Sequence, residues 1–296
     1  MKLAYKTELG ECYHGEIEEA LKNKTFMQYK GEVQLIFTSP PFPLNTKKKY
    51  GNKNGPDYVK WLTSITTALK DYLTDNGSLV IEIGNAWEPN KPAMSTLPLE
   101  TLLSIKKNGG FELCQQFVWF NTAKLPSPAQ WVNVERSRVK DSFTNIWWMS
   151  KSVSPHADNR KVLEAYSSSM EKLLKNQKYN SGMRPSQHNI GKDSFLTDHG
   201  GAIPSNVLVA ANTASRSSYL DYCKENEMSP HPARMPRFVA DFFIQFLTVK
   251  GDLVLDPFAG SNTSGESAEH LERKWLAVEA DRNYVVGSQA KFPGSP

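Results

Sequence analysis

Apolar residues along the chain follow two alternating patterns. Dense apolar runs bounded by turn residues are typical of buried strands, and apolar residues recurring every three or four positions are typical of helices. The strand-like runs cover 2–7, 33–37, 78–85, 111–121, 145–152, 253–255 and 275–278, and helical spacing covers 16–24, 57–74, 97–109, 238–247 and a segment ending at 272. Because strands and helices alternate, the pattern predicts an α/β domain with a mostly parallel sheet.

Residues 153–229 depart from this alternation. They are rich in Ser, Asn, Gly, Lys and His, with strand character only at 202–211 and one expected helix at 160–175. The sequence therefore predicts an inserted region outside the sheet, which separates residues 1–152 from residues 230–296.

One strand-like run ends abruptly. The run from Val33 to Phe37 passes through Thr38 into Ser39, Pro40, Pro41 and Phe42. Neither proline has an N–H, and the second holds the first in an extended conformation. We therefore expect a rigid turn at the carboxyl end of a strand, where open α/β sheets place their ligands.

A glycine-rich turn follows another buried strand near the end of the sequence. The segment from Asp252 to Gly265 reads DLVLDPFAGSNTSG and opens a helix, whose first N–H groups are free to bind a ligand. Nineteen residues after Gly260, Glu279 ends the next strand, which is where a carboxylate holds a ribose in βαβ nucleotide sites. This turn alone leaves a dinucleotide and S-adenosylmethionine as alternatives. It lacks the Gly-Lys-Ser/Thr of a phosphate-binding P-loop.

The composition narrows the class of protein. The 296 residues are 39% hydrophobic and 22% charged, as expected for a soluble globular protein, and no apolar run is long enough to span a membrane. The N-terminal segment lacks the apolar core of a signal peptide. Three scattered cysteines fit a reducing cytoplasm and argue against a disulfide framework or a zinc site. The net charge of +4 permits nucleic-acid binding without requiring it.

Basic residues gather in two stretches. A glycine- and asparagine-rich loop at 43–56 carries no acid before residue 57. A second stretch, between the strands at 111–121 and 145–152, interleaves basic residues with Trp131 and Phe143, as in grooves that clamp nucleotides. The predicted DNA-binding residues are Lys47, Lys48, Lys49, Lys53, Lys124, Arg136 and Arg138.

Taken together, the motifs resemble those of the DNA amino-methyltransferases. These are the Ser-Pro-Pro-aromatic turn at 39–42, the Asp-Pro-Phe-x-Gly-Ser turn at 256–261 and the segment HPARMP at 231–236. The catalytic turn comes early and the cofactor turn late, which is the permuted order of the β group. The resemblance implies a Rossmann-like, circularly permuted fold for S-adenosylmethionine-dependent methyl transfer. It makes 1–152 the catalytic half, 230–296 the cofactor half and 153–229 the target-recognition region.

The resemblance also implies roles for single residues. Catalysis falls to Ser39, Pro40, Pro41 and Phe42, with Phe42 stacking on a base flipped out of the duplex. The implied cofactor-binding residues are Glu11, His231, Asp256, Pro257, Phe258, Ala259, Gly260, Ser261, Asn262 and Glu279. At Asn262 many relatives have glycine, but asparagine tolerates the same backbone region.

The implied reaction is methyl transfer from S-adenosylmethionine to the N4 amine of cytosine in duplex DNA. Serine before the prolines, rather than Asp or Asn, favours cytosine N4 over adenine N6, which remains the nearest alternative. The enzyme needs no metal, and a restriction endonuclease sharing its site is expected to be a separate chain. A dinucleotide-dependent oxidoreductase would explain Glu279 but not the turn at 39–42. A third alternative is a non-catalytic DNA-binding module, which would bind no cofactor.

Overall fold

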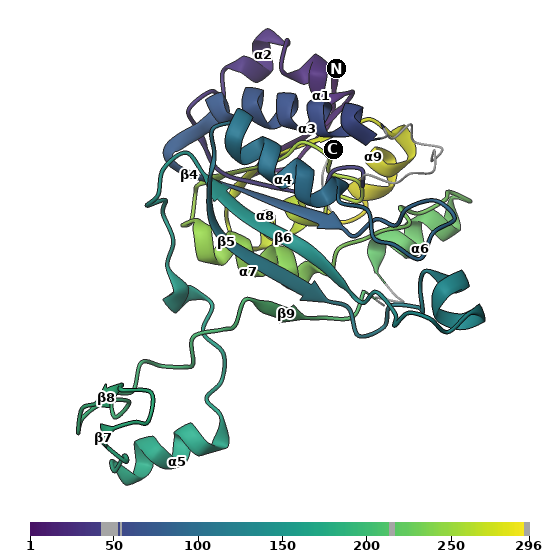
Figure 1. Cartoon of the computed structure of the whole chain (residues 1–296). Coiled ribbons are helices and arrows are strands. Elements are labelled where there is room, and N and C mark those ends of the chain that lie inside the picture. The colour runs from purple at the N-terminus through teal and green to yellow at the C-terminus, as the bar shows by residue number, and fades with distance from the viewer. Residues whose placement is uncertain (43–52, 54, 213–216, 293–296) are drawn as a thin grey trace. The chain divides into compact units, whose positions relative to one another are not determined.

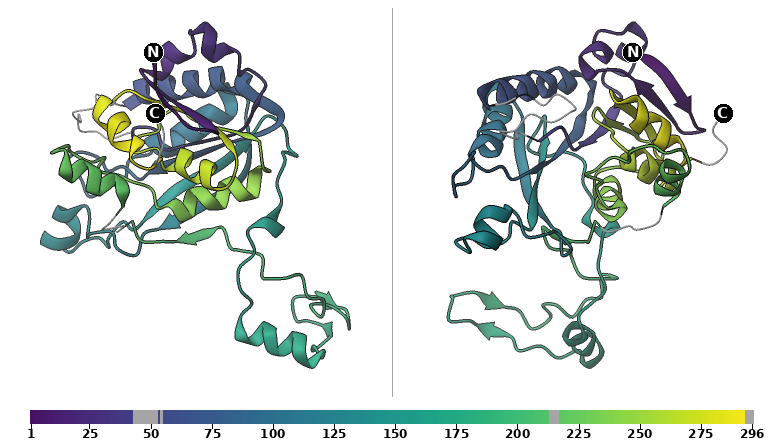
Figure 2. Two further views of the ribbon diagram at one scale, coloured as in Figure 1. Left: turned by 180° about the vertical axis from the view of Figure 1, so that it is seen from behind. Right: turned by 90° about the vertical axis from the view of Figure 1, so that its right-hand side faces the viewer.

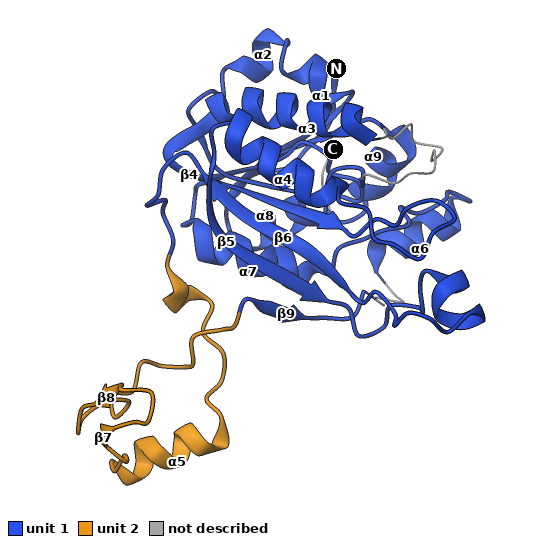
Figure 3. Cartoon of the chain, viewed as in Figure 1, with its two compact units in different colours: residues 1–157, 206–296 blue, residues 158–205 orange. Residues whose placement is uncertain are grey.

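The computed structural model describes residues 1–42, 53, 55–212 and 217–292. The chain divides into two compact units, one formed by 1–157 with 206–296 and the other by 158–205 (Figure 3). The first unit is an α/β domain built on one large sheet (Figure 1).

The described sheet has nine strands in the order β1-β2-β11-β10-β3-β4-β6-β5-β9. Strands β2, β11, β10, β3 and β4 run parallel to one another. Strand β6 is antiparallel to both β4 and β5, β9 is parallel to β5, and β1 is antiparallel to β2. The strands are β1 (Lys2–Lys6), β2 (Gly10–His14), β3 (Val33–Thr38), β4 (Leu73–Gly84), β5 (Glu112–Phe120), β6 (Phe143–Ser150), β9 (Val207–Val209), β10 (Leu253–Asp256) and β11 (Lys274–Glu279). The predicted mostly parallel α/β sheet is confirmed.

Helices cover both faces of this sheet. In Figure 2, α3 (Gly55–Leu69) and α4 (Leu97–Asn108) lie on one face, and α7 (Arg237–Leu247), α8 (Thr263–His270) and α9 (Arg282–Gln289) lie on the other. All six residues of β3 are buried, as expected for a parallel strand covered on both sides. Phe37 of this strand stacks on Phe243 of α7, with ring centroids 5.7 Å apart.

The junction between α3 and β4 differs from the sequence prediction. The helix expected to reach residue 74 ends at Leu69, one short turn follows at Lys70–Tyr72, and β4 already begins at Leu73. Val33 pairs with Leu73 but Leu35 pairs with Ser78, so residues 75–77 are extra residues within the strand. Gly77 fits there because a Cβ would lie 3.0 Å from the Val33 carbonyl oxygen.

Other predicted elements are shorter than expected. The helix at 16–24 is two short helices, α1 (Ile17–Ala20) and α2 (Lys24–Met27), because the Asn23 side chain accepts hydrogen bonds from the N–H groups of Thr25 and Phe26 and starts a new helix. The strand expected at 202–211 is limited to β9.

The second unit contains α5 (Ser168–Asn176) and a small hairpin of β7 (Gly182–Met183) and β8 (Asn189–Ile190). It lies within the predicted insertion at 153–229. The rest of that insertion contributes β9 and α6 (Ser218–Glu225) to the first unit. In the described part of the chain, no helix combines the length and apolar character needed to cross a bilayer.

Candidate active site

The two turns predicted from the sequence meet at one edge of the sheet. Strands β3 and β10 are parallel neighbours, with Ile36 opposite Leu255, so their carboxyl ends lie together. The Thr38 hydroxyl at the end of β3 donates a 2.7 Å hydrogen bond to the Asp256 carboxylate at the end of β10. This bond joins residues 218 positions apart and holds the catalytic turn against the cofactor turn.

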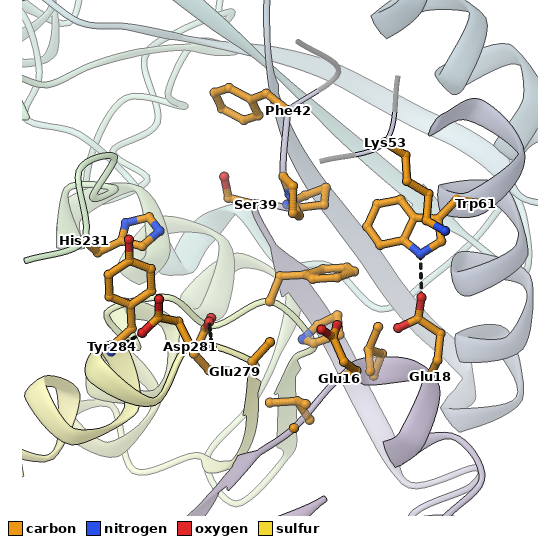
Figure 4. A pocket seen from close by; sticks show the side chains of 18 of the residues that line it. Glu16, Glu18, Ser39, Phe42, Lys53, Trp61, His231, Glu279, Asp281 and Tyr284 are labelled. Carbon is orange, nitrogen blue, oxygen red and sulfur yellow. Dashed lines mark hydrogen bonds between the residues drawn. The ribbon is translucent and has the colours of Figure 1, made fainter. Parts of the chain in front are cut away.

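A cavity of about 850 Å³ opens at this edge (Figure 4). Its volume is within the range of small-molecule and cofactor sites. Its walls come from the turn after β2, the catalytic turn, α3 with Lys53 before it, the segment before α7, the cofactor turn, the end of β11 and the first turn of α9. The lining residues that carry the argument are Ser39, Phe42, Trp61, His231, Phe258, Glu279 and Tyr284.

Asp256 supports this cavity from behind. Its carboxylate accepts hydrogen bonds from the hydroxyls of Thr38 and Ser264 and from the Phe258 N–H, and it is not among the lining residues. Burial raises the pKa of this carboxyl, and these three donors oppose that shift. Asp256 therefore fixes the shape of the cofactor turn.

The cofactor turn depends on two left-handed residues. Gly260 has φ of 53° and Asn262 has φ of 54°, and asparagine tolerates this region. The Asn262 side chain accepts a hydrogen bond from Gly265 N–H, which caps α8, and donates to the Tyr5 hydroxyl. Of the seven predicted residues at 256–262, Pro257 and Phe258 line the cavity, whereas Ala259, Gly260, Ser261 and Asn262 shape the turn around it.

Glu279 presents a fixed carboxylate to the cavity. One oxygen accepts the Gly260 N–H at 2.7 Å, and the other accepts the Asp281 N–H at 2.8 Å. Burial raises the pKa of Glu279 to about 7. Each oxygen retains acceptor capacity, so the carboxylate is suited to hold ligand hydroxyls.

His231 lines the opposite part of the wall near Tyr284 (Figure 4). Its ring lies edge-on to Tyr284 with centroids 4.7 Å apart, and its backbone N–H donates to the Tyr219 hydroxyl at 2.8 Å. Burial and the nearby Arg234 lower the pKa of His231 to about 4, so the ring is neutral. Its Nδ1 atom is buried with no hydrogen-bond partner among the described residues.

The turn after β2 supplies acids that the sequence analysis missed. Glu16 and Glu18 line the cavity, and one Glu18 oxygen accepts the Trp61 indole N–H at 2.6 Å. Glu11, the predicted residue, lies three positions before the end of β2 and is not a lining residue. Its carboxylate is engaged by Lys6 and by the Tyr13 and Tyr29 hydroxyls. The position along the strand could have identified Glu16 and Glu18. Side chains that follow the carboxyl end of a parallel strand reach the ligand-binding edge of the sheet, whereas side chains within the strand do not.

A second residue that the sequence analysis missed is the hydrogen-bond partner of Ser39, the predicted catalytic serine. The Ser39 hydroxyl is hydrogen-bonded to the carboxylate of Glu82, which is 4% exposed and lies in the apolar run of β4. Burial raises the pKa of Glu82 to about 7, although Ser39 and the Lys124 ammonium oppose the shift. A carboxylate inside an otherwise apolar strand was the available sequence signal, because unpaired burial of a charge is costly.

Phe42 lies against the backbone of β4. A Cβ placed on Gly84 would come within 2.5 Å of the Phe42 ring, so the ring requires glycine there. One face of the ring is therefore supported at the end of β4, two residues beyond Glu82.

The predicted basic residues are dispersed. Lys47, Lys48 and Lys49 lie outside the described residues, and Lys53 lines the cavity with its ammonium 6.0 Å from the centre of the Trp61 ring. The other three belong to the connection between β5 and β6. Lys124 pairs with Asp141 at 3.7 Å, the Arg138 guanidinium donates to the carbonyls of Pro92 and Ser137, and Arg136 is exposed.

Comparisons with known proteins agree with this arrangement. Residues 33–290 match a family model described as DNA methylase. The Type II methyltransferase M.PvuII of Proteus hauseri is 42% identical over 294 residues, which cover 98% of this chain and 86% of that protein. The Type II methyltransferase M.BglII of Bacillus subtilis is 23% identical, with 98% of this chain and 71% of that protein covered.

Solved structures extend the likeness to the fold. The PvuII DNA methyltransferase (cytosine-N4-specific) superimposes with a TM-score of 0.79 at 36% identity, covering 98% of this chain and 89% of that one. The M1.HpyAVI–SAM complex shares the fold, with a TM-score of 0.58 at 18% identity over 96% of this chain and 100% of that one. Because the family model and the M.PvuII relative both cover most of its length, this chain belongs to the DNA methylase family and is a DNA methyltransferase.

Proposed function

We propose that this protein transfers the methyl group of S-adenosylmethionine to the exocyclic N4 amine of cytosine in duplex DNA. The observation that carries the proposal is the Ser39 hydroxyl, which lines the cavity formed with the cofactor turn and has the Glu82 carboxylate as its hydrogen-bond partner. The similar PvuII DNA methyltransferase is cytosine-N4-specific, which supports it. The adenine-N6 alternative is not favoured, since serine stands before the prolines here.

The cavity fits S-adenosylmethionine in three respects. Glu279 offers a pinned carboxylate for ribose hydroxyls, aromatic rings of Phe258 and Trp61 offer apolar faces, and His231 offers an unpartnered buried nitrogen. When bound, the cofactor supplies an electrophilic methyl group on a sulfonium. Because that methyl group is already activated, we infer that the chemistry requires no metal.

The residues of the catalytic turn act on the base. Phe42, supported by Gly84, offers a ring face on which a flipped cytosine stacks. The Ser39 hydroxyl and the Pro40 carbonyl accept hydrogen bonds from the N4 amine. These bonds direct the nitrogen lone pair toward the methyl group, so positioning supplies much of the rate. Ser39 then passes the amine proton to Glu82, and no covalent enzyme intermediate forms.

We further propose that the region 153–229, including the separate unit at 158–205, reads the DNA sequence. The basic residues at 47–53 and 124–138 would contact phosphates around the site. The protein would protect DNA from a restriction endonuclease encoded as a separate chain. Protection of methylated DNA from candidate endonucleases tests this partner.

Mass spectrometry of nucleosides tests the reaction. Duplex DNA is incubated with the protein and S-adenosylmethionine, digested and compared with a reaction that lacks the cofactor. N4-methylcytosine is the expected product. N6-methyladenine would contradict the assignment of the base while leaving the family unchanged.

A further inference from the structure

The connection between β5 and β6 lies at the same edge of the sheet as the catalytic turn. Because β6 is antiparallel to both β4 and β5, β5 runs parallel to β4, and its carboxyl end shares an edge with those of β3 and β4. At this edge the Asn85 amide donates a 2.8 Å hydrogen bond to Asp141, near the end of the connection. Asn85 follows Gly84, the residue against which the Phe42 ring packs. The connection is therefore bonded to the strand end that supports this ring.

Two backbone hydrogen bonds hold the two limbs of this connection together. The Asn121 N–H donates to the Ser142 carbonyl at 2.8 Å, and the Asp141 N–H donates to the Ser127 carbonyl at 3.0 Å. The first limb leads away from β5, and the second limb leads into β6. The two limbs therefore lie side by side as they leave the edge of the sheet.

Leu125 and Val139 project into solvent from these two limbs. Leu125 is 80% exposed and Val139 is 88% exposed. They flank a contact between the limbs, because Leu125 follows Lys124, Val139 precedes Lys140, and the Lys140 ammonium donates to the Lys124 carbonyl at 3.5 Å. Two large aliphatic side chains with this exposure, next to a ligand-binding edge, form an apolar projection that the fold itself does not cover.

The charge of the connection indicates which partner covers this projection. The connection carries four basic and two acidic residues, which are Lys124, Arg136, Arg138, Lys140, Glu135 and Asp141. Both acids are bonded within the chain, since the Gln130 amide donates to Glu135 at 3.0 Å and the Asn85 amide donates to Asp141. Basic residues around an apolar projection suit duplex DNA, whereas lysine is depleted at interfaces between proteins.

We propose that Leu125 and Val139 form an apolar wedge that enters the duplex beside the flipped base and fills the space that the base leaves. The inference rests on the proposed function, in which Phe42 stacks on that base. Apolar side chains inserted between base steps replace part of the stacking that the duplex loses. The two residues therefore act on the opening of the base pair and not on the methyl transfer itself.

This role separates the wedge from a general DNA contact. A bound target base can be methylated only while it is flipped, so a weaker wedge lowers the fraction of bound sites that react. Unpairing is least costly for a mismatched base. A mismatch opposite the target should therefore compensate for the loss of the wedge, whereas it would not compensate for a loss within the catalytic turn.

The test is the rate of methyl transfer in a single turnover at saturating protein, with radiolabelled S-adenosylmethionine. The substrate is a duplex oligonucleotide carrying the site that sequencing identifies in DNA methylated by the parent protein. A second duplex is identical except for a mismatched base opposite the target. The double variant Leu125→Ala/Val139→Ala should be at least about tenfold slower than the parent on the matched duplex, because burial of a Leu or Val side chain is worth that factor or more. On the mismatched duplex its rate should approach that of the parent.

Two further variants control this comparison. Leu125→Met/Val139→Ile keeps the apolar wedge and should retain the parent rate on both duplexes. Leu103→Ala truncates a leucine of α4 that is 50% exposed, and it should also match the parent. Because all the substituted side chains are exposed, each variant should keep the thermal unfolding and the cofactor affinity of the parent protein.

Three results would overturn the inference. An equal loss on both duplexes would mean that Leu125 and Val139 act on a step other than unpairing, and an unchanged rate on the matched duplex would mean that they fill no gap. A changed oligomeric state of the double variant in light scattering, without rescue by the mismatch, would show that a second copy of the chain covers these side chains. A wrong methylated nucleoside would contradict the proposed function instead, and the comparison would stand because the radiolabel does not depend on the base.

Discussion

At the residue scale, Ser39, the predicted catalytic serine, has its hydrogen-bond partner on a different strand. Ser39 comes from the turn after β3, and its hydrogen-bond partner Glu82 is a buried residue of β4. Substitution of Ser39 by alanine should lower turnover about a hundredfold, because the amine loses both its acceptor and its route for the proton. The Kd for S-adenosylmethionine should be unchanged, since the cofactor turn is intact.

This prediction is measured by single-turnover kinetics and calorimetric titration of the cofactor. Ser64→Ala, on the exposed side of α3, is the control and should change neither quantity. An equal loss of turnover and of cofactor affinity in Ser39→Ala would contradict the role assigned to Ser39.

Glu82 also links stability to pH. Burial raises its pKa from 4.5 to about 7, so the folded protein holds this proton more tightly than the unfolded chain does. The stabilisation from the bound proton is complete below pH 4.5 and is lost as the pH rises through 7. Glutamine cannot lose a proton, so the Glu82→Gln variant does not lose this stabilisation. The difference in unfolding free energy between the variant and the parent protein should therefore be about 2–3 kcal/mol more favourable to the variant at pH 8 than at pH 4.

Urea unfolding at the two pH values measures this double difference, which cancels the constant effect of the amide. The exposed Glu32→Gln variant should show no such change. A double difference near zero for Glu82→Gln would mean that Glu82 has the same proton affinity in both states.

Gly84 is required by the ring that it supports. A methyl group at this position would collide with Phe42, because the Cβ would lie 2.5 Å from a ring carbon. Gly84→Ala should lower methyl transfer by about tenfold to a hundredfold through misplacement of the base, with cofactor affinity retained. In a Phe42→Ala background the same substitution should have little further effect, and an additive loss would show that Gly84 acts through another contact.

At the scale of elements, the pairing of β3 with β10 brings the two motifs into one site. Thr38 is 3% exposed and is the side chain that joins the two turns. Thr38→Val keeps the shape but removes one of the two donors to the buried Asp256 Oδ1, leaving only the Phe258 N–H, which should cost about 1–3 kcal/mol. It should weaken cofactor binding and turnover together, in contrast to Ser39→Ala.

The matched control is Thr66→Val on α3, whose buried hydroxyl bonds only to carbonyls of its own helix. It should change stability without affecting the Kd for S-adenosylmethionine. Thermal unfolding and titration separate the two cases. A Thr38→Val protein with full cofactor affinity would show that the turns hold their places independently.

The sequence predicted these elements unevenly, for physical reasons. The motifs at 39–42 and 256–261 were found because prolines and glycines restrict or free the backbone locally. Glu82 and Glu18 were missed because their roles depend on which strands are neighbours and where each strand ends. The end of the helix expected at 57–74 was placed too late, because a glycine that follows a helix and a glycine in a strand irregularity, such as Gly77, look alike in sequence.

At the scale of the whole molecule, the order of the motifs predicted the family, and this prediction is confirmed by the match over residues 33–290. The assignment of DNA reading to 153–229 stays a prediction. Within that range the structure separates residues 158–205 as a compact unit, and β9 and α6 belong to the first unit. The composition of the sequence could not locate the boundary at residue 205, because β9, the strand that follows it, has only three residues and leaves no clear apolar pattern.

The separate unit should be dispensable for folding of the first unit. Replacing 158–205 by a Gly/Ser linker removes no strand of the large sheet, whose described members all lie in 1–157 and 206–296. The shortened protein should bind S-adenosylmethionine with the parent affinity and lose site-specific methylation. Calorimetric titration and sequencing of methylated sites measure these outcomes, and loss of cofactor binding would show that the unit is needed for the site itself.

The position of β11 and β10 within the sheet also determines when, during synthesis of the chain, the active site can form. The N-terminal hairpin of β1 and β2 joins the sheet through β11, and the catalytic turn after β3 is braced by β10. A ribosome makes residues 1–42 first, and β3 can pair with β4 as soon as β4 has been made. The hairpin of β1 and β2 has no strand of the described sheet to pair with, and Thr38 has no Asp256 to bond with, until residues 253–279 emerge. A partly made chain is therefore unable to modify DNA. Activity begins only when β10 and β11 have been made and pair between β2 and β3.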